Sequence, residues 1–122
     1  MAAKDGVGRY GERIAARYLT ESGLQVVQRN WRSPDRDVPG ELDIIALDGD
    51  TTVVVEVKTR RSEACGSALE AVTPAKLGRL RRLAGVYLRT TQVGTAGVRI
   101  DVVTVRRPPT GAAVVSHLRA VG

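Results

Sequence analysis

The stretch GELDIIALDGDTTVVVEVK, at positions 40–58, constrains the fold most strongly. Val, Ile and Leu dominate both sides of an Asp-Gly-Asp sequence, which is typical of two β-strands joined by a tight turn. We therefore expect strands at 41–47 and 52–59 that pair as an antiparallel hairpin. Four charged residues interrupt the apolar pattern, namely Glu41, Asp43, Glu56 and Lys58. They form either the solvated face of an ordinary hairpin or a site that carries chemistry.

The sequence on both sides of the hairpin predicts the remaining elements. We expect helices at 6–21 and 74–89, and further strands at 24–32, 98–107 and 112–121. Thr73-Pro74 is a good helix start, because Thr caps a helix well and Pro suits the first helical position. The order α-β-β-β-α-β-β predicts an α/β fold, in which helices flank a mixed sheet of about five strands with the last strand at an edge. The whole chain, 1–122, is expected to form one domain.

The first helix has an apolar stripe with the helical period. The residues of this stripe are Val7, Tyr10, Ile14 and Tyr18. The rotation of 100° per residue puts Glu12 on the flank of the stripe, near Ala15 and Leu19. The second helix is expected to turn Lys76 and its arginines mostly outward.

The charge of the chain is unevenly distributed. Residues 1–57 carry 7 basic and 10 acidic side chains, whereas residues 58–122 carry 12 basic and 3 acidic ones. A basic half beside a local acidic cluster suits a protein that holds a polyanion such as nucleic acid. A solvated basic surface with no such partner is the alternative.

The single cysteine, Cys65, excludes an intrachain disulfide and a zinc site built from cysteines. This cysteine content fits a reducing compartment. The N-terminal residues lack the apolar core of a signal peptide, and no apolar run approaches the length that spans a membrane. We therefore expect a cytoplasmic protein without a membrane partner.

Strand alternation brings the charged residues of the hairpin together. It puts Glu41 and Asp43 on one face of the first strand, and Glu56 and Lys58 on one face of the second. A turn over 49–50 would put Asp43 opposite Glu56 and Glu41 opposite Lys58. A turn shifted by one residue would instead put Glu41 opposite Glu56. Either register gathers three carboxylates and a lysine into one patch.

This patch needs a cation, because like charges that face each other across a sheet are destabilising. A divalent metal such as Mg²⁺ is one candidate, since it takes oxygen ligands and binds through one or two carboxylates with water and substrate phosphate. Lys58 is the other candidate, as the cation of a charge triad without metal. The hairpin leaves both possibilities open.

Asp43 followed by Glu56-Val57-Lys58 on adjacent strands, after a helix bearing Glu12, resembles the PD-(D/E)XK nuclease superfamily. Within it, the chain resembles the YraN family of bacterial proteins, which is similar in fold to archaeal Holliday-junction resolvases. The resemblance covers about residues 8–105. It rests on the motifs GERIAARYL, NWR, GELDIIA and VEVKTR, and on the helix that contains Lys76.

The resemblance implies a restriction-endonuclease-like core and Mg²⁺- or Mn²⁺-dependent hydrolysis of DNA phosphodiester bonds, with branched or damaged DNA as candidate substrates. The implied catalytic residues are Lys58, Asp43, Glu56 and Glu12. The implied metal ligands are Asp43, Glu56 and the backbone carbonyl of Val57, with Glu12 and Glu41 as further candidates. Lys58 would orient or activate the attacking water. A symmetric homodimer is expected, since resolvase-like enzymes cut two strands.

Basic residues are candidates for contacts with the phosphate backbone. They are Arg13, Arg60, Arg61, Lys76, Arg79 and Arg82. A non-catalytic nucleic-acid-binding module that keeps the nuclease fold is the alternative function, and its binding would be salt-sensitive and independent of metal. A protein–protein adaptor is a third hypothesis.

Four other residues carry possible chemistry. Trp31 is expected in the core rather than stacked on a base, and His117 is expected to be structural. Cys65 lies in an expected loop without a partner motif and receives no catalytic role. Asp101 interrupts an apolar strand as either a helper of the site or a salt-bridge partner, and the sequence leaves that choice open.

Overall fold

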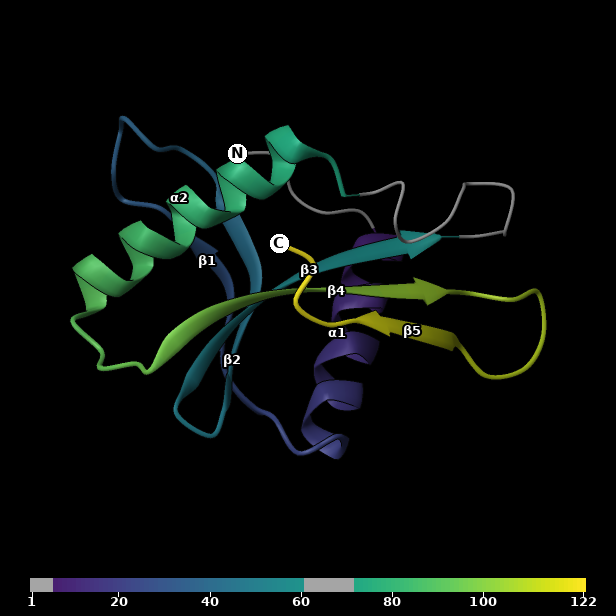
Figure 1. Cartoon of the computed structure of the whole chain (residues 1–122). Coiled ribbons are helices and arrows are strands. Elements are labelled where there is room, and N and C mark those ends of the chain that lie inside the picture. Colours follow the sequence, from purple (N-terminus) through teal and green to yellow (C-terminus); the bar gives the residue numbers. More distant parts are fainter. Residues whose placement is uncertain (1–5, 61–71) are drawn as a thin grey trace.

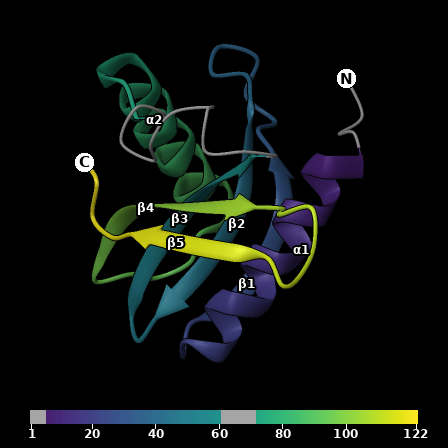
Figure 2. The same ribbon diagram turned by 90° about the vertical axis from the view of Figure 1, so that its right-hand side faces the viewer.

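The sheet that the hairpin predicts is the centre of the molecule, and a helix packs on each of its faces (Figures 1 and 2). The computed structural model describes residues 6–60 and 72–122. Its elements are α1 (Gly6–Glu21), β1 (Gln25–Arg32), β2 (Glu41–Asp48), β3 (Thr51–Arg60), α2 (Pro74–Thr91), β4 (Gly97–Arg106) and β5 (Val114–Leu118). This order confirms the predicted α-β-β-β-α-β-β layout.

The five strands lie in the order β1-β2-β3-β4-β5. β3 and β4 are parallel and are joined by the crossover that contains α2, whereas the other neighbours are antiparallel. The sheet is therefore mixed, as predicted, and β5 forms the expected edge. No helix within the described ranges is long and apolar enough to cross a membrane.

α2 begins where the sequence predicts. The Thr73 hydroxyl accepts a hydrogen bond of 3.1 Å from the Lys76 N–H, and Pro occupies the first helical turn. The helix runs to Thr91, two residues beyond the predicted end, because Gln92 caps it in a left-handed conformation and donates its N–H to the Leu88 carbonyl. The cap fixes the backbone of the first turn, which carries Lys76.

Two aliphatic clusters hold the layers together, one on each face of the sheet. α2 contributes Leu80 and Leu83 to the first cluster, which also contains Trp31. The Trp31 ring meets the Tyr87 ring edge-on with centroids 5.5 Å apart, which confirms the predicted core position. α1 contributes Leu19 to the second cluster, against aliphatic side chains of the three central strands.

The buried side of α1 differs from the predicted stripe. Gly11, Glu12, Ala15 and Leu19 are buried, whereas Tyr10, Ile14 and Tyr18 only flank the core. The reason is a close approach of the helix to β3, since a Cβ atom at Gly11 would overlap the Thr59 side chain. This approach turns Glu12 toward the sheet rather than along the flank.

The hairpin turns over 49–50, as one of the two predicted registers requires. Asp48 pairs with Thr51, and the pairing continues to Ile44 with Val55. Gly49 has a φ of 61°, which suits a glycine in this turn.

Regular alternation along β2 ends at Asp43. Leu42 packs in the cluster under α2, whereas Ile44 packs in the cluster under α1, although residues two apart normally share a face. Strict alternation would put Glu41, Asp43, Ile45 and Leu47 on one face of the strand, and this expectation is wrong because alternation breaks between Leu42 and Ile44. Neighbouring β1 is also irregular, with a register shift between Val26 and Gln28 and a φ of 54° at Asn30.

Candidate active site

The candidate site forms where β2 and β3 separate (Figure 1). Their pairing ends at Ile44 and Val55, and beyond it the Val57 N–H donates a hydrogen bond of 2.8 Å to Asp43 Oδ2. The carboxylate thus supplies the acceptor that a main-chain carbonyl would supply in a continuing ladder. This bond holds the Asp43 side chain against β3.

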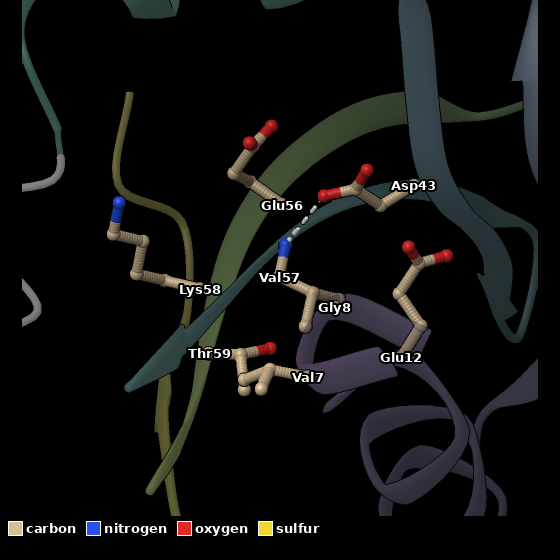
Figure 3. Close-up of a pocket in the computed structure, with 8 residues that line it drawn as sticks. All are labelled: Val7, Gly8, Glu12, Asp43, Glu56, Val57, Lys58 and Thr59. Atoms are coloured by element: carbon tan, nitrogen blue, oxygen red, sulfur yellow. Dashed lines mark hydrogen bonds between the residues drawn. The ribbon is translucent and has the colours of Figure 1, made fainter. Parts of the chain in front are cut away.

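A pocket of about 310 Å³ opens at this point (Figure 3). Its lining residues are Val7, Gly8, Glu12, Asp43, Glu56, Val57, Lys58 and Thr59. Three elements contribute one carboxylate each, with Glu12 from α1, Asp43 from β2 and Glu56 from β3. The structure therefore brings together three predicted acidic residues that are far apart in the sequence.

Glu56 is the carboxylate whose environment disfavours its charge most clearly. Its side chain is 15% exposed, and Lys76 Nζ lies 3.3 Å from Glu56 Oε1. Burial and the neighbouring negative charge of Asp43 raise the pKa of Glu56, although Lys76 and Arg79 oppose the rise. A carboxylate in this environment gains from an additional cation.

Glu12 is held in the pocket by helix packing. It is 3% exposed, and the contact between Gly11 and Thr59 fixes the adjacent turn of α1 against β3. In Figure 3 its carboxylate lies on the same side of β3 as that of Asp43. The sequence predicts Glu12 as a site residue through the family resemblance alone, because its helical position suggests a flank.

Lys58 lines the same pocket but extends away from Asp43 and Glu12 (Figure 3). It is exposed, and the cation beside Glu56 is Lys76 instead. Glu41 has Arg32 as its neighbour, at 4.0 Å, across the β1–β2 pair. The predicted cross-strand pairs of Glu41 with Lys58 and of Asp43 with Glu56 lie beyond the last paired residues of the hairpin.

The contact between Lys76 and Glu56 was not expected from the sequence, which predicts an outward Lys76 that binds phosphate. The two residues lie in different elements, and their contact depends on how α2 crosses the sheet. The only local signal is the Thr73 cap, which places Lys76 in the first turn of the helix. That signal gives the position of the lysine along α2 but not its partner.

The donor atoms of the pocket fit a hard divalent cation in kind. Carboxylate oxygens of Asp43 and Glu56 and the carbonyl of Val57 are the oxygen ligands that Mg²⁺ and Mn²⁺ prefer, and Mg²⁺ commonly uses only one or two carboxylates. Within residues 6–60 and 72–122, however, no three Asp, Glu, His or Cys side chains are grouped so that they could hold one ion together. A cation here would therefore rely on two carboxylates and the Val57 carbonyl, with water in its remaining positions.

The basic candidates occupy different surroundings. Arg79 and Arg82 are exposed on α2, and Arg13 is exposed on α1, where its guanidinium lies 5.8 Å from the Tyr10 ring centre. Arg60 is only 9% exposed at the end of β3, which does not favour direct contact with a phosphate. Arg61 and Cys65 lie outside the described residues.

A second polar cluster is buried between β4, β5 and α1. The Asp101 carboxylate is fully buried, accepts two hydrogen bonds of 3.0 and 3.1 Å from Arg99, and lies 2.8 Å from His117 Nε2. His117 Nδ1 lies 3.1 Å from the Tyr18 hydroxyl. The structural role predicted for His117 is thus confirmed, and Asp101 is a salt-bridge partner rather than a lining residue of the pocket.

Comparisons with known proteins identify the family of the chain. Residues 11–105 match the uncharacterised protein family UPF0102. The chain is 57% identical to a UPF0102 protein of Beutenbergia cavernae and 49% identical to one of Arthrobacter sp. strain FB24, in both cases over the full length of both chains. It is 55% identical to a UPF0102 protein of Kineococcus radiotolerans, over 99% of this chain and 97% of the relative. None of these matches names an activity, so the nuclease superfamily and the resolvase likeness stay predictions. The chain belongs to the protein family UPF0102.

Proposed function

We propose that the protein is a divalent-metal-dependent nuclease that hydrolyses DNA phosphodiester bonds. The observation that carries this proposal is that Glu12, Asp43, Glu56 and Lys58 line the same pocket. Carboxylates that lie close together, in surroundings that disfavour their negative charge, are common where a protein binds a cation for catalysis. The family resemblance gives the same residues the same roles.

The residues of the pocket would divide the work as follows. Asp43 and Glu56 would hold the cation with the Val57 carbonyl, and the bond from the Val57 N–H keeps Asp43 in place. A cation bound there would lower the pKa of a coordinated water and offset negative charge on the phosphoryl oxygens. Lys58 would swing on its flexible stem toward the phosphate and orient the attacking water. Glu12 would accept a hydrogen bond from that water.

DNA is the proposed substrate because basic residues border the carboxylates. Lys76 and Arg79 line a second pocket of about 310 Å³ in the first turn of α2, and Arg82 is exposed one turn further along. Such residues bind phosphates irrespective of base sequence, so binding would weaken steeply with salt. Branched and damaged DNA are the first forms to test.

One observation favours the alternative of a binding module without catalysis. Lys76 already places a positive charge beside Glu56, at 3.3 Å, and so partly satisfies the carboxylate without metal. A module of this kind would bind DNA with the same salt dependence, with no effect of Mg²⁺ or Mn²⁺ and no cleavage.

Cleavage of labelled single-stranded, nicked and four-way-junction DNA with Mg²⁺ or Mn²⁺ tests the proposal. Asp43→Asn and Glu56→Gln should each reduce the cleavage rate by on the order of 10²- to 10³-fold, the loss typical of a residue that stabilises charge in the transition state, while DNA binding persists. Asp50→Asn, at the far end of the same hairpin, should cleave like the wild type. Metal-independent binding without cleavage of any substrate would instead establish the binding module.

A further inference from the structure

Lys76 lies between the two pockets of this end of the molecule. Its ammonium is 3.3 Å from Glu56 Oε1 in the carboxylate pocket, yet the residue also lines the basic pocket with Ala75 and Arg79. Its side chain is 27% exposed, so it has room to move. Its backbone is fixed, because its N–H is bonded to the Thr73 hydroxyl. Only the side chain can therefore exchange between the two pockets.

The ion pair between Lys76 and Glu56 is of a kind that breaks easily in favour of other partners. Partly exposed ion pairs contribute little, because water competes for both charges. A divalent cation at Glu56 would neutralise the carboxylate and repel the ammonium, since like charges a few ångström apart interact strongly at the edge of a protein. The released ammonium would then be available beside Arg79.

We propose that Lys76 exchanges between Glu56 and a substrate phosphate, and so couples cation binding at the carboxylates to phosphate binding on α2. The inference rests on the proposed function and adds a regulation to the same site. Without a cation, Lys76 neutralises Glu56 and contributes little to DNA binding. With a cation in place, Lys76 binds phosphate, so each ligand strengthens the binding of the other by the same factor.

A variant without the Lys76 ammonium tests the effect of Lys76 on cation binding and its effect on DNA binding separately. In Lys76→Met the Mn²⁺ affinity, measured by calorimetry without DNA, should rise by about fivefold, the factor that corresponds to a partly exposed ion pair. The affinity for a labelled DNA duplex, measured by fluorescence anisotropy, should no longer increase when Ca²⁺ is added as a cation that takes the same oxygen ligands. Wild-type protein should show that increase.

Two variants serve as controls. Arg89→Met removes a matched ion pair of α2, since Arg89 Nη2 lies 3.2 Å from Asp35 Oδ2 away from both pockets. It should leave the Mn²⁺ affinity and the coupling at wild-type values. Lys76→Arg keeps the charge and should keep the coupling. A loss of coupling in Lys76→Arg would assign the effect to side-chain packing, and a loss in Arg89→Met would assign it to the general charge of α2. Either result would overturn the inference.

The remaining outcomes distinguish the two proposals. If wild type binds Mn²⁺ and Lys76→Met binds it equally or more weakly, the exchange of Lys76 is wrong while the metal site stands. If neither protein binds Mn²⁺, the proposed metal-dependent function fails, and the exchange fails with it.

Discussion

At the scale of single residues, the carboxylates of Glu56 and Asp101 have contrasting surroundings. Burial and the nearby negative charge of Asp43 raise the pKa of Glu56, and Lys76 offsets only part of the rise. Asp101 has a full set of hydrogen-bond donors, so its charge is satisfied within the protein. The first environment suits the binding of a cation, whereas the second stabilises the fold.

The Asp101 cluster predicts a pH dependence of stability. Burial by itself would raise the pKa of Asp101, but hydrogen bonds from Arg99, from the Ala120 N–H and from His117 outweigh it and lower the pKa below its ordinary value of 3.8. The folded protein therefore releases this proton more readily than the unfolded chain. The resulting stabilisation is present above about pH 3.8 and is lost as the pH falls through the lowered folded-state pKa.

Asp101→Asn should lower the free energy of unfolding at pH 7 by about 3 kcal/mol, the cost of breaking a buried pair. The difference from wild type should shrink as the pH falls below 3.8. Urea denaturation at a series of pH values measures both quantities, with the exposed Asp37→Asn as the control. A difference that stays constant down to pH 2 would contradict the assigned role.

The sequence predicts some residues of the candidate site but not their contacts, for physical reasons. Asp43 and Glu56 stand out because charges interrupt an apolar hairpin. Lys76 beside Glu56 could not be predicted, because an ion pair between a helix and a strand depends on the crossing of α2 over the sheet. The burial of Glu12 was also missed, because a helical stripe is recognised by its apolar residues and Glu12 is charged.

At the scale of the elements, the close packing of α1 on β3 positions the site. Gly11 permits that approach, since a Cβ atom there would overlap the Thr59 side chain. The next residue is Glu12, and Thr59 itself lines the pocket. The spacing between helix and strand therefore sets the position of one carboxylate relative to the other two.

Gly11→Ala should force α1 away from β3 and lower the free energy of unfolding by about 1–3 kcal/mol, the usual cost of overpacking. It should also weaken Mn²⁺ binding if Glu12 helps to hold the ion. Gly85→Ala is the matched control, since a Cβ at this position of α2 meets nothing within 4 Å. That change should stabilise the protein by up to about 1 kcal/mol, because Ala favours the helix. Chemical denaturation would contradict the account if both variants were equally stable.

The elements were largely predictable from local signals, but their irregularities were not. The turn residues and the apolar runs predict the hairpin and leave two registers, of which the structure has the turn over 49–50, and Thr73-Pro74 predicts the start of α2. The break of alternation at Asp43 has no local sequence signal. The break depends on the three-dimensional structure, because it occurs where the pairing of β2 with β3 ends and the Asp43 carboxylate takes the place of a backbone acceptor.

At the scale of the whole molecule, several features converge on one end of the sheet. The first turns of both helices border the pocket, through Val7 and Gly8 of α1 and through Lys76 of α2. Neither first turn contains an acidic residue. The positive ends of both helix dipoles are thus available to an anion, and Lys76 and Arg79 of α2 lie near Glu56 of the acidic cluster. This arrangement suits a cation and a phosphate bound side by side.

The most direct test of this account is the position of a bound metal. Crystals soaked in Mn²⁺ should give an anomalous-scattering peak in the pocket, within about 2.0–2.3 Å of oxygens of Asp43 and Glu56, and the peak should vanish in Glu56→Gln. A fully occupied Mn²⁺ peak elsewhere, or none in the pocket at millimolar Mn²⁺, would contradict the central claim that these carboxylates form a metal site.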